Sequence, residues 1–226
     1  MIELSDLLTG NPYPGRGVLC ARTLTGETVG GYFLTGRSAA SRDRALRLEG
    51  DELLVGPTET VGHDPLRHYA AATTTPDWLV LGNGEQVGQV AARLRDGAAS
   101  TEALGGLEYE PDPPIRTSRI TALLSRDGRT AVLGAARPSA GSRLTTNVMT
   151  LTVQDLQPGE GVLLTTYRSD GAEVLVAAPF DEVSITAQDG AHLLDQMWSA
   201  LNPGYRVAAV VIDPAKGPAS MLKVSA

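Results

Sequence analysis

Arginine and hydroxyl side chains recur in loops beside predicted strands, where they could bind a phosphate ester. Residues 13–17 read YPGRG, a rigid turn that places Arg16 at the start of a strand. Residues 36–38 read GRS and follow another apolar run, so that Arg37 and Ser38 lie in one loop. Guanidinium groups and hydroxyls match the oxygens of a phosphate monoester. A solvated charged loop is the alternative explanation of the second segment.

Two further segments carry groups that suit proton transfer. Tyr69 follows an Asp-Pro pair and has a phenol that could donate a proton, although a strand tyrosine more often packs in the core. Glu110 lies in residues 108–119, EYEPDPPIRTSR, together with Thr117 and Arg119. Three prolines exclude a regular element there, and rigid loops on a sheet scaffold commonly hold functional sites. The alternative is a surface connection.

The sequence lacks the signatures of several other chemistries. It has no phosphate loop, no GxSxG and no dinucleotide-binding glycine motif. His63, His68 and His192 lack the spacing of zinc ligands, so we expect no metal. The one cysteine, Cys20, excludes an internal disulfide and lies in a predicted strand, where a small buried residue is expected.

Composition bounds the class of protein. The 226 residues are 42% hydrophobic and 20% charged, which is typical of a globular domain, and we expect one domain over residues 1–226. The net charge of −7 gives no basic field for nucleic acid. No apolar run approaches the ~18 residues of a membrane span. The first ten residues lack the pattern of a signal peptide, so we expect a cytoplasmic protein.

The elements that must position the polar residues are mostly strands joined by tight turns. Gly26, Asp127-Gly128 and Asp170-Gly171 mark three hairpin turns. The expected strands are residues 17–24, 29–35, 46–48, 53–55, 67–75, 78–82, 120–126, 130–136, 144–153, 162–168, 173–178 and 205–213.

Three helices interrupt the strands. Val87, Val90, Ala91 and Leu94 have the spacing of one helical face, and Gly97 ends that helix. A short helix over 101–107 and a longer one over 188–201 follow, and the tail after the last strand is expected to be irregular. Abundant hairpins favour an α+β fold with two stacked, largely antiparallel sheets and helices on their outer faces.

Taken in order, four stretches resemble the archaeal-type inosine monophosphate (IMP) cyclohydrolase family. They are YPGRGVLCARTLTGETVGGYFLTGRSAASRDRA, DPLRHYAAA, LVLGNGEQVGQVAARL and LEYEPDPPIRTSRITALL, and they cover roughly residues 13–124. The resemblance implies a four-layer αββα sandwich similar to that of the N-terminal nucleophile hydrolases, without the N-terminal nucleophile.

The resemblance also implies a reaction and a set of site residues. The substrate would be a purine ribotide, 5-formamidoimidazole-4-carboxamide ribotide, whose carboxamide nitrogen attacks its own formyl carbon with loss of water. No cofactor or metal is required, and a homo-oligomer is expected. The roles implied are substrate binding and oxyanion polarisation for Arg37, proton donation for Tyr69, amide orientation for Asn83 and general base for Glu110. Candidates for contacts to the ribotide and its phosphate are Arg16, Ser38, Thr117 and Arg119.

Two other functions remain open on the sequence. An amidohydrolase acting on a related nucleotide or amide would consume water, whereas ring closure expels it. A non-catalytic module would bind a purine nucleotide without turnover.

Overall fold

The computed structural model describes residues 1–58, 68–139 and 144–225. His63 and the Asp64-Pro65 pair lie outside these ranges. The described residues form a mixed α/β structure of mostly antiparallel sheets, which confirms the expected class at that level. Among them, no helix has the length and apolar character needed to cross a membrane.

The first sheet has seven strands in the order β1–β14–β11–β2–β3–β15–β16. Every neighbouring pair is antiparallel except β1 and β14. Its strands are β1 (Ile2–Glu3), β2 (Arg16–Arg22), β3 (Thr28–Thr35), β11 (Glu160–Thr165), β14 (Phe180–Ser184), β15 (Arg206–Ile212) and β16 (Leu222–Ser225).

The second sheet has seven strands in the order β10–β9–β8–β7–β6–β5–β4 and is antiparallel throughout. Its strands are β4 (Ala45–Glu49), β5 (Glu52–Gly56), β6 (Tyr69–Thr74), β7 (Trp78–Gly82), β8 (Arg119–Ser125), β9 (Thr130–Pro138) and β10 (Thr146–Gln154). A separate two-stranded ladder joins β12 (Tyr167–Arg168) to β13 (Leu175–Val176).

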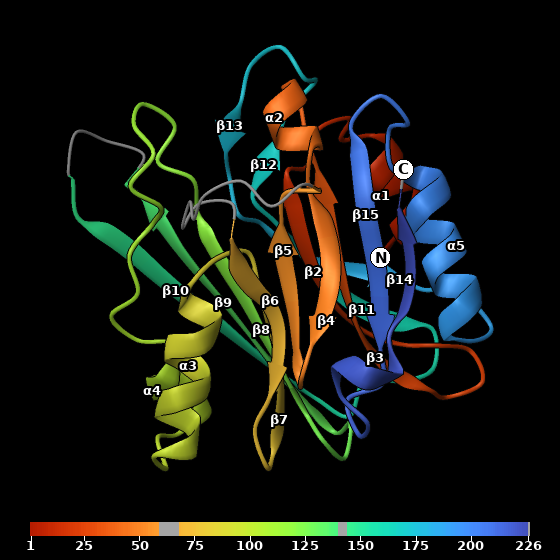
Figure 1. Ribbon diagram of the computed structural model, residues 1–226. Helices are drawn as coiled ribbons and strands as arrows, with labels where there is room; N and C mark the ends of the chain where they lie inside the picture. Colours follow the sequence, from red (N-terminus) through yellow and green to blue (C-terminus); the bar gives the residue numbers. More distant parts are fainter. Residues whose placement is uncertain (59–67, 140–143, 226) are drawn as a thin grey trace.

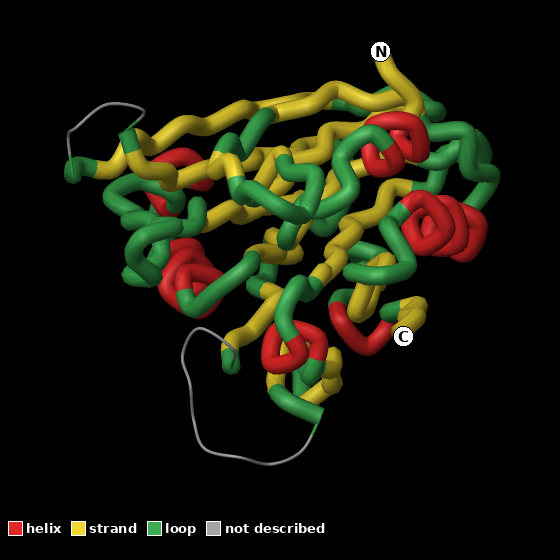
Figure 2. The backbone as a smooth tube through the Cα atoms, turned by 90° about the horizontal axis from the view of Figure 1, so that it is seen from above, coloured by secondary structure: helices red, strands yellow, loops and turns green. Residues whose placement is uncertain are grey.

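Helices pack on one face of each sheet. The helices α1 (Leu4–Thr9) and α5 (Gly190–Ala200) bury their apolar side chains against the first sheet. The helices α3 (Gln86–Arg95) and α4 (Ser100–Ala103) do the same against the second sheet. Figures 1 and 2 show these two pairs at opposite sides of the strands. The short helix α2 (Ala39–Arg42) and a 3-10 turn (Pro218–Ser220) lie in loops.

A third apolar cluster, here called the intersheet core, fills the space between the two sheets. On β2, Val18 and Cys20 enter the intersheet core, whereas Leu19 and Ala21 face α1 and α5. This alternation follows from the two-residue period of a strand. Because both faces of the central strands are covered, β2 reads as an almost continuous apolar run.

Most of the expected elements are confirmed. The hairpin around Gly26 is β2 and β3, the Asp127-Gly128 hairpin is β8 and β9, and the helices from 86 and from 190 are α3 and α5. The helix expected over 101–107 ends at Ala103, and Gly105-Gly106 follows it. The six-residue helix α1 was not expected.

Two expectations hold only in part. The turn at Asp170-Gly171 joins only the two-residue strands β12 and β13, because the main strand β11 instead pairs with β2 and β14. The chain leaves the first sheet at Thr166, whose backbone N–H donates to the Arg16 carbonyl. The tail is also not irregular throughout, since β16 adds to the edge of the first sheet beside β15.

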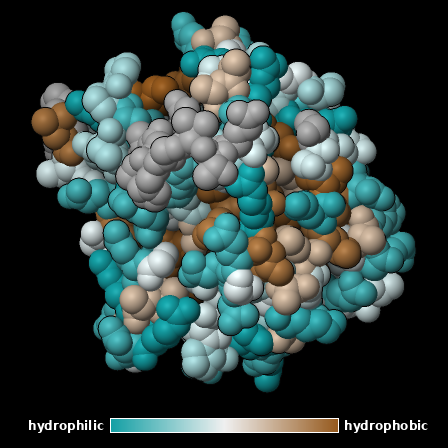
Figure 3. All heavy atoms as spheres, in the orientation of Figure 1, coloured by the Kyte–Doolittle hydropathy of each residue, from teal (hydrophilic) through white to brown (hydrophobic). Residues whose placement is uncertain are grey.

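The surface in the view of Figure 1 is mainly hydrophilic. Figure 3 shows hydrophilic side chains over most of this face, with hydrophobic ones mainly towards its middle and right. The large apolar residues therefore lie chiefly in the three internal clusters.

Candidate active site

A buried ion pair joins the two sheets. Arg16 at the start of β2 donates through Nη2 to Oε1 of Glu110, which lies in the loop between α4 and β8. The two side chains are only 11% and 6% exposed. Burial raises the pKa of Glu110, and Arg16 partly counteracts this effect. Burial also disfavours the charged form of Arg16, but Glu110 and nearby tyrosine hydroxyls raise the pKa of Arg16 well above its ordinary value.

Asn83 holds this pair from the end of β7. Its Nδ2 donates to Glu110 Oε1 at 3.2 Å and to the Ser118 carbonyl at 2.8 Å. Its Oδ1 accepts from the Ile120 backbone N–H at 2.8 Å and from Gln86 Nε2 at 2.9 Å. Both hydrogens and both lone pairs of the amide are thus used by the protein, which fixes its orientation. Asn83 therefore positions Glu110.

Gln86 belongs to the same hydrogen-bond network and was not identified from the sequence. It is fully buried at the start of α3, and its Nε2 also donates to the Ile120 carbonyl at 3.1 Å. The only signal in the sequence is a glutamine beside the apolar helical face, two residues after Gly84 of the Asn-Gly turn.

Two tyrosines meet across the sheets next to the ion pair. Tyr32 on β3 and Tyr69 on β6 are both buried, and their hydroxyl oxygens lie 2.9 Å apart. Both interact electrostatically with Arg16 and with the buried Arg44. Arg44 donates to the carbonyls of Thr35 at 3.0 Å and Ser41 at 2.7 Å. The two phenols therefore lie near two buried guanidinium groups, those of Arg16 and Arg44.

A chain of hydrogen bonds joins the buried Tyr167 hydroxyl to a half-exposed carboxylate. Thr117 Oγ1 donates to Asp112 Oδ2 at 2.6 Å, and the Thr117 backbone N–H donates to Oδ1 at 2.7 Å. Because the hydroxyl hydrogen of Thr117 is used in this way, the Tyr167 hydroxyl is the donor in its 2.5 Å hydrogen bond to Thr117 Oγ1. Tyr167 is buried and interacts electrostatically with both Arg16 and Glu110.

Buried polar atoms without a protein partner surround the cluster. Within the described residues they include Arg16 Nε, Gln86 Oε1, Ser118 Oγ and Arg119 Nε. Unpaired buried donors and acceptors are costly, so such atoms mark where water or a ligand is expected to bind. Arg119 donates to Glu85 at 2.7 Å and lowers the pKa of Glu110, against the effect of burial.

Arg37 and Ser38 lie apart from the ion pair. Arg37 is exposed, donates to the carbonyls of Gly171 at 3.3 Å and Ala172 at 3.1 Å, and lies over the Tyr13 ring at 5.8 Å. Tyr13 in turn stacks on Tyr167 with ring centroids 5.7 Å apart. Ser38 is exposed and accepts from the Ser41 backbone N–H at 3.1 Å, so it caps α2.

The structure thus brings together part of the predicted set of residues. Hydrogen bonds and electrostatic interactions link Glu110, Asn83, Arg16, Tyr69, Thr117 and Arg119 into one buried network. Arg37 lies at its rim, over the Tyr13 ring that stacks on Tyr167, and the next residue, Ser38, is exposed. In the described ranges, no three His, Cys, Asp or Glu side chains are grouped so as to hold a metal ion.

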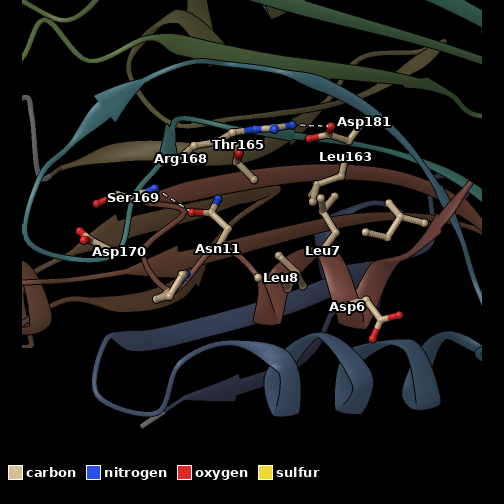
Figure 4. A pocket seen from close by; sticks show the side chains of 13 residues that line it. Asp6, Leu7, Leu8, Asn11, Leu163, Thr165, Arg168, Ser169, Asp170 and Asp181 are labelled. Atoms are coloured by element: carbon tan, nitrogen blue, oxygen red, sulfur yellow. Dashed lines mark hydrogen bonds and ion pairs between the residues drawn. The ribbon is translucent and has the colours of Figure 1, made fainter.

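A separate pocket of about 470 Å³ lies between α1 and the segment that carries Tyr167 (Figure 4). Its wall includes Asn11, which donates to the Tyr167 carbonyl at 2.8 Å and accepts from the Ser169 N–H at 2.9 Å. Arg168 and Asp181 form an ion pair at 2.8 Å on another side. The pocket does not open on Glu110, but its wall fixes the backbone of Tyr167.

Comparisons with known proteins agree on one family. The sequence model of the family described as "IMP cyclohydrolase-like protein" matches residues 13–217. The chain is 30% identical over 160 residues to an IMP cyclohydrolase of Methanopyrus kandleri, and this match covers 69% of this chain and 75% of the relative. It is also 30% identical over 168 residues to an IMP cyclohydrolase of Methanothrix thermoacetophila, and that match covers 71% of this chain and 77% of the relative.

Proposed function

Because this chain belongs to the IMP cyclohydrolase-like family, we propose that it is an IMP cyclohydrolase acting in purine biosynthesis. It closes the ring of 5-formamidoimidazole-4-carboxamide ribotide to give IMP. The observation that carries the proposal is the buried carboxylate of Glu110, held by Arg16 and Asn83 inside the matched region.

The reaction needs proton transfer more than any added reagent. The carboxamide nitrogen forms a bond to the formyl carbon, and the formyl oxygen gains a proton to become a hydroxyl. The carbon–oxygen bond then breaks as a C=N bond forms to the formamido nitrogen. The oxygen leaves as water with one proton from the carboxamide nitrogen and one from the formamido nitrogen. Since both reacting groups belong to one molecule, the enzyme contributes by holding the folded substrate conformation and by moving these protons.

Glu110 is the general base in this scheme. A carboxylate whose pKa is raised by burial is a stronger base than an ordinary glutamate, which suits removal of a proton from an amide. Arg16 keeps Glu110 ionised, and its unpartnered Nε is a donor suited to the negative charge that develops on the formyl oxygen. This assigns Arg16 to the reacting end of the substrate, in the place first expected for Arg37.

Tyr69 donates a proton to the formyl oxygen as it becomes a leaving group. The 2.9 Å contact between its hydroxyl and that of Tyr32 keeps the phenol in place. Tyr167, Thr117 and Asp112 form a second route, through which a proton passes between the buried site and a half-exposed carboxylate.

The rim binds the ribotide and its phosphate. Arg37 is an exposed guanidinium and Ser38 adds a hydroxyl, a combination suited to phosphate oxygens. Arg119, with a buried Nε that lacks a protein partner, is suited to the ribose or base nearer the carboxylate.

The assay is ring closure of the synthetic formamido ribotide by the purified protein, followed by ultraviolet absorbance. Turnover well above the buffer rate supports the proposal, and turnover at the buffer rate contradicts it. Repeating the reaction in ¹⁸O-labelled water separates an amidohydrolase, because hydrolysis puts a water-derived oxygen into the product and ring closure does not. A thermal shift with IMP but no turnover would identify a binding module.

The finer architecture and the setting of the protein belong to the same proposal. The two sheets, the intersheet core and the helices on the outer faces support a four-layer αββα sandwich resembling that of the N-terminal nucleophile hydrolases. We propose one domain over residues 1–226, a cytoplasmic location as suits a biosynthetic enzyme, and a homo-oligomer. None of these roles calls for nucleic acid or a membrane.

A further inference from the structure

Strand β10 forms one edge of the second sheet and is unusually long for an edge. It runs for nine residues, TNVMTLTVQ, at the left-hand border of Figure 1. Among the strands in the described residues, β9 is its one partner. An edge strand presents backbone donors and acceptors that can pair with another strand.

The other three sheet edges are short or charged, as edges usually are. β1 has two residues, and β4 carries Arg47 and Glu49. β16 has four residues and includes Lys223, whose Nζ donates to the Leu46 carbonyl at 3.0 Å. β10 has no charged residue, no proline and no glycine. It therefore lacks the features that normally prevent pairing between chains.

Both faces of β10 also leave apolar or uncharged side chains incompletely covered. On one face Val148 is 40% exposed and is followed by exposed Thr150 and Thr152. On the other face Met149 and Leu151 are only partly buried against the intersheet core. A strand added beyond β10 would cover side chains on both faces.

We propose that two copies of this chain pair through β10, antiparallel and about a two-fold axis at Thr150, so that the two second sheets become one. In this register Val148 lies opposite Thr152 of the other copy, and Thr150 lies opposite Thr150. It is the one antiparallel register in which all nine residues overlap. A two-fold contact places each strand against itself, which an uncharged strand allows because no like charges face each other.

The proposal commits to a second copy because β10 is complementary to itself. Threonine pairs are favourable neighbours across antiparallel strands, and β-branched residues such as valine and threonine suit strands. The pairing is independent of the proposed chemistry, since β10 carries none of the residues assigned to the reaction.

A cysteine at position 150 tests the axis. Directly opposed residues of antiparallel strands have Cα atoms about 4.5–5.5 Å apart, which is within the range of a disulfide. We expect the Thr150→Cys variant to form a disulfide-linked dimer under mild oxidation. The native Cys20 does not interfere, because it is fully buried and burial raises the pKa of its thiol to about 12.

The matched control is Thr152→Cys. In the proposed register the two copies of residue 152 are offset by four residues, or about 13 Å, so they cannot form a disulfide. Efficient linkage at 150 with little at 152 supports the proposal. Equal linkage at both positions, or none at 150, overturns it.

Sedimentation provides a second measurement that needs no cross-link. The unmodified chain is expected to sediment as a dimer, at twice its mass of 23.7 kDa. The Thr150→Lys variant sets two ammonium groups against each other at the axis, so it is expected to sediment as a monomer. Thr101→Lys, at an exposed position of α4, should keep the mass of the unmodified chain. A monomeric unmodified chain, or a Thr150→Lys variant of unchanged mass, contradicts the proposal.

Discussion

In the proposed mechanism, Glu110 and Arg16 form a buried pair that serves the chemistry at a cost in stability. Removing two charges from water costs several kcal/mol per ion, and the attraction between them offsets this only when further hydrogen bonds help. Asn83 supplies such a bond to Glu110. Arg16 Nε still lacks a partner, so one buried donor of the guanidinium is left unpaired. A bound substrate would supply that partner.

The acid limb of the pH–rate profile should report Glu110. The base must be ionised, and burial raises its pKa above the ordinary 4.5, so activity should fall as the pH drops through a value above 4.5. Arg16 lowers that pKa, and the Arg16→Met variant should therefore move the limb to higher pH. Measurement of kcat/KM against pH checks both points.

The control for this shift is Arg129→Met, which breaks the ion pair between Arg129 and Asp155. Both side chains of that pair are largely exposed, at 71% and 60%. It should leave the limb where it was. If Arg16→Met gives an unshifted limb at measurable activity, Glu110 is not the group that titrates.

A substitution at Thr117 distinguishes a role in the proton relay from a role in phosphate binding. If its hydroxyl passes a proton between Tyr167 and Asp112, Thr117→Val should lower kcat by about tenfold, a part of the usual contribution of acid–base catalysis, and leave KM nearly unchanged. If Thr117 instead contacts the ribotide phosphate, KM should rise.

Thr121→Val is the matched control for Thr117→Val. Thr121 lies on β8 between Ile120 and Ala122 of the intersheet core, so its side chain faces the helices and not Arg16. Its buried hydroxyl has no partner, so its loss should leave kcat unchanged and stability equal or slightly higher. Equal kcat losses in the two variants would rule out the relay.

Strand β2 depends on a glycine beside Arg16. Gly17 pairs with Phe33 of β3, and a Cβ at Gly17 would overlap the Phe33 ring. The Gly17→Ala variant should therefore lose about 1–3 kcal/mol of unfolding free energy, as overpacked cores do, because the ring is held in the cluster beneath α5. Urea denaturation followed by circular dichroism measures this loss.

Gly88 in α3 provides the opposite case. It is exposed in the helix, and a Cβ there would meet no atom within 4 Å. Gly88→Ala should therefore raise the unfolding free energy by about 0.5–1 kcal/mol through helix propensity. A destabilised Gly88→Ala, or a Gly17→Ala as stable as the unmodified chain, would contradict this description of the packing.

Local sequence signals predicted the elements that depend on contacts between residues close together in the sequence. The Asp127-Gly128 turn and the spacing of Val87, Val90 and Ala91 are satisfied within one hairpin and one helix. β16 was not predictable in this way, because four residues that include Lys223 become a strand only by pairing with β15. The Asp170-Gly171 signal gave a turn, but the partners of β11 are set by strands far along the chain.

At the scale of the whole molecule, the site exists only because two sheets meet. Arg16 and Glu110 are separated by 94 positions in the sequence; Arg16 begins β2 of the first sheet, and Glu110 lies in the loop that leads into β8 of the second. Sequence motifs indicated that each residue could take part in chemistry, but not that the two would form an ion pair. The roles of Tyr32, Tyr167 and Gln86 could not be predicted either, since each resembles an ordinary core or capping residue until its neighbours are known.

The same view explains where Arg37 lies. Its loop follows β3 of the first sheet, but stacked Tyr13 and Tyr167 separate its guanidinium from the ion pair. A motif places a residue near a site along the chain, and only the packing decides whether it reaches the reacting atoms or the rim.

The most direct test of the central claim is the ring-closure rate of Glu110→Gln beside that of the unmodified protein. The substitution keeps the size of the side chain and a hydrogen-bond acceptor for Arg16 but removes the base. With the fold intact by circular dichroism, we predict that kcat falls at least 100-fold, the lower range of general-base contributions. A folded Glu110→Gln variant that closes the ring at the unmodified rate would contradict the account.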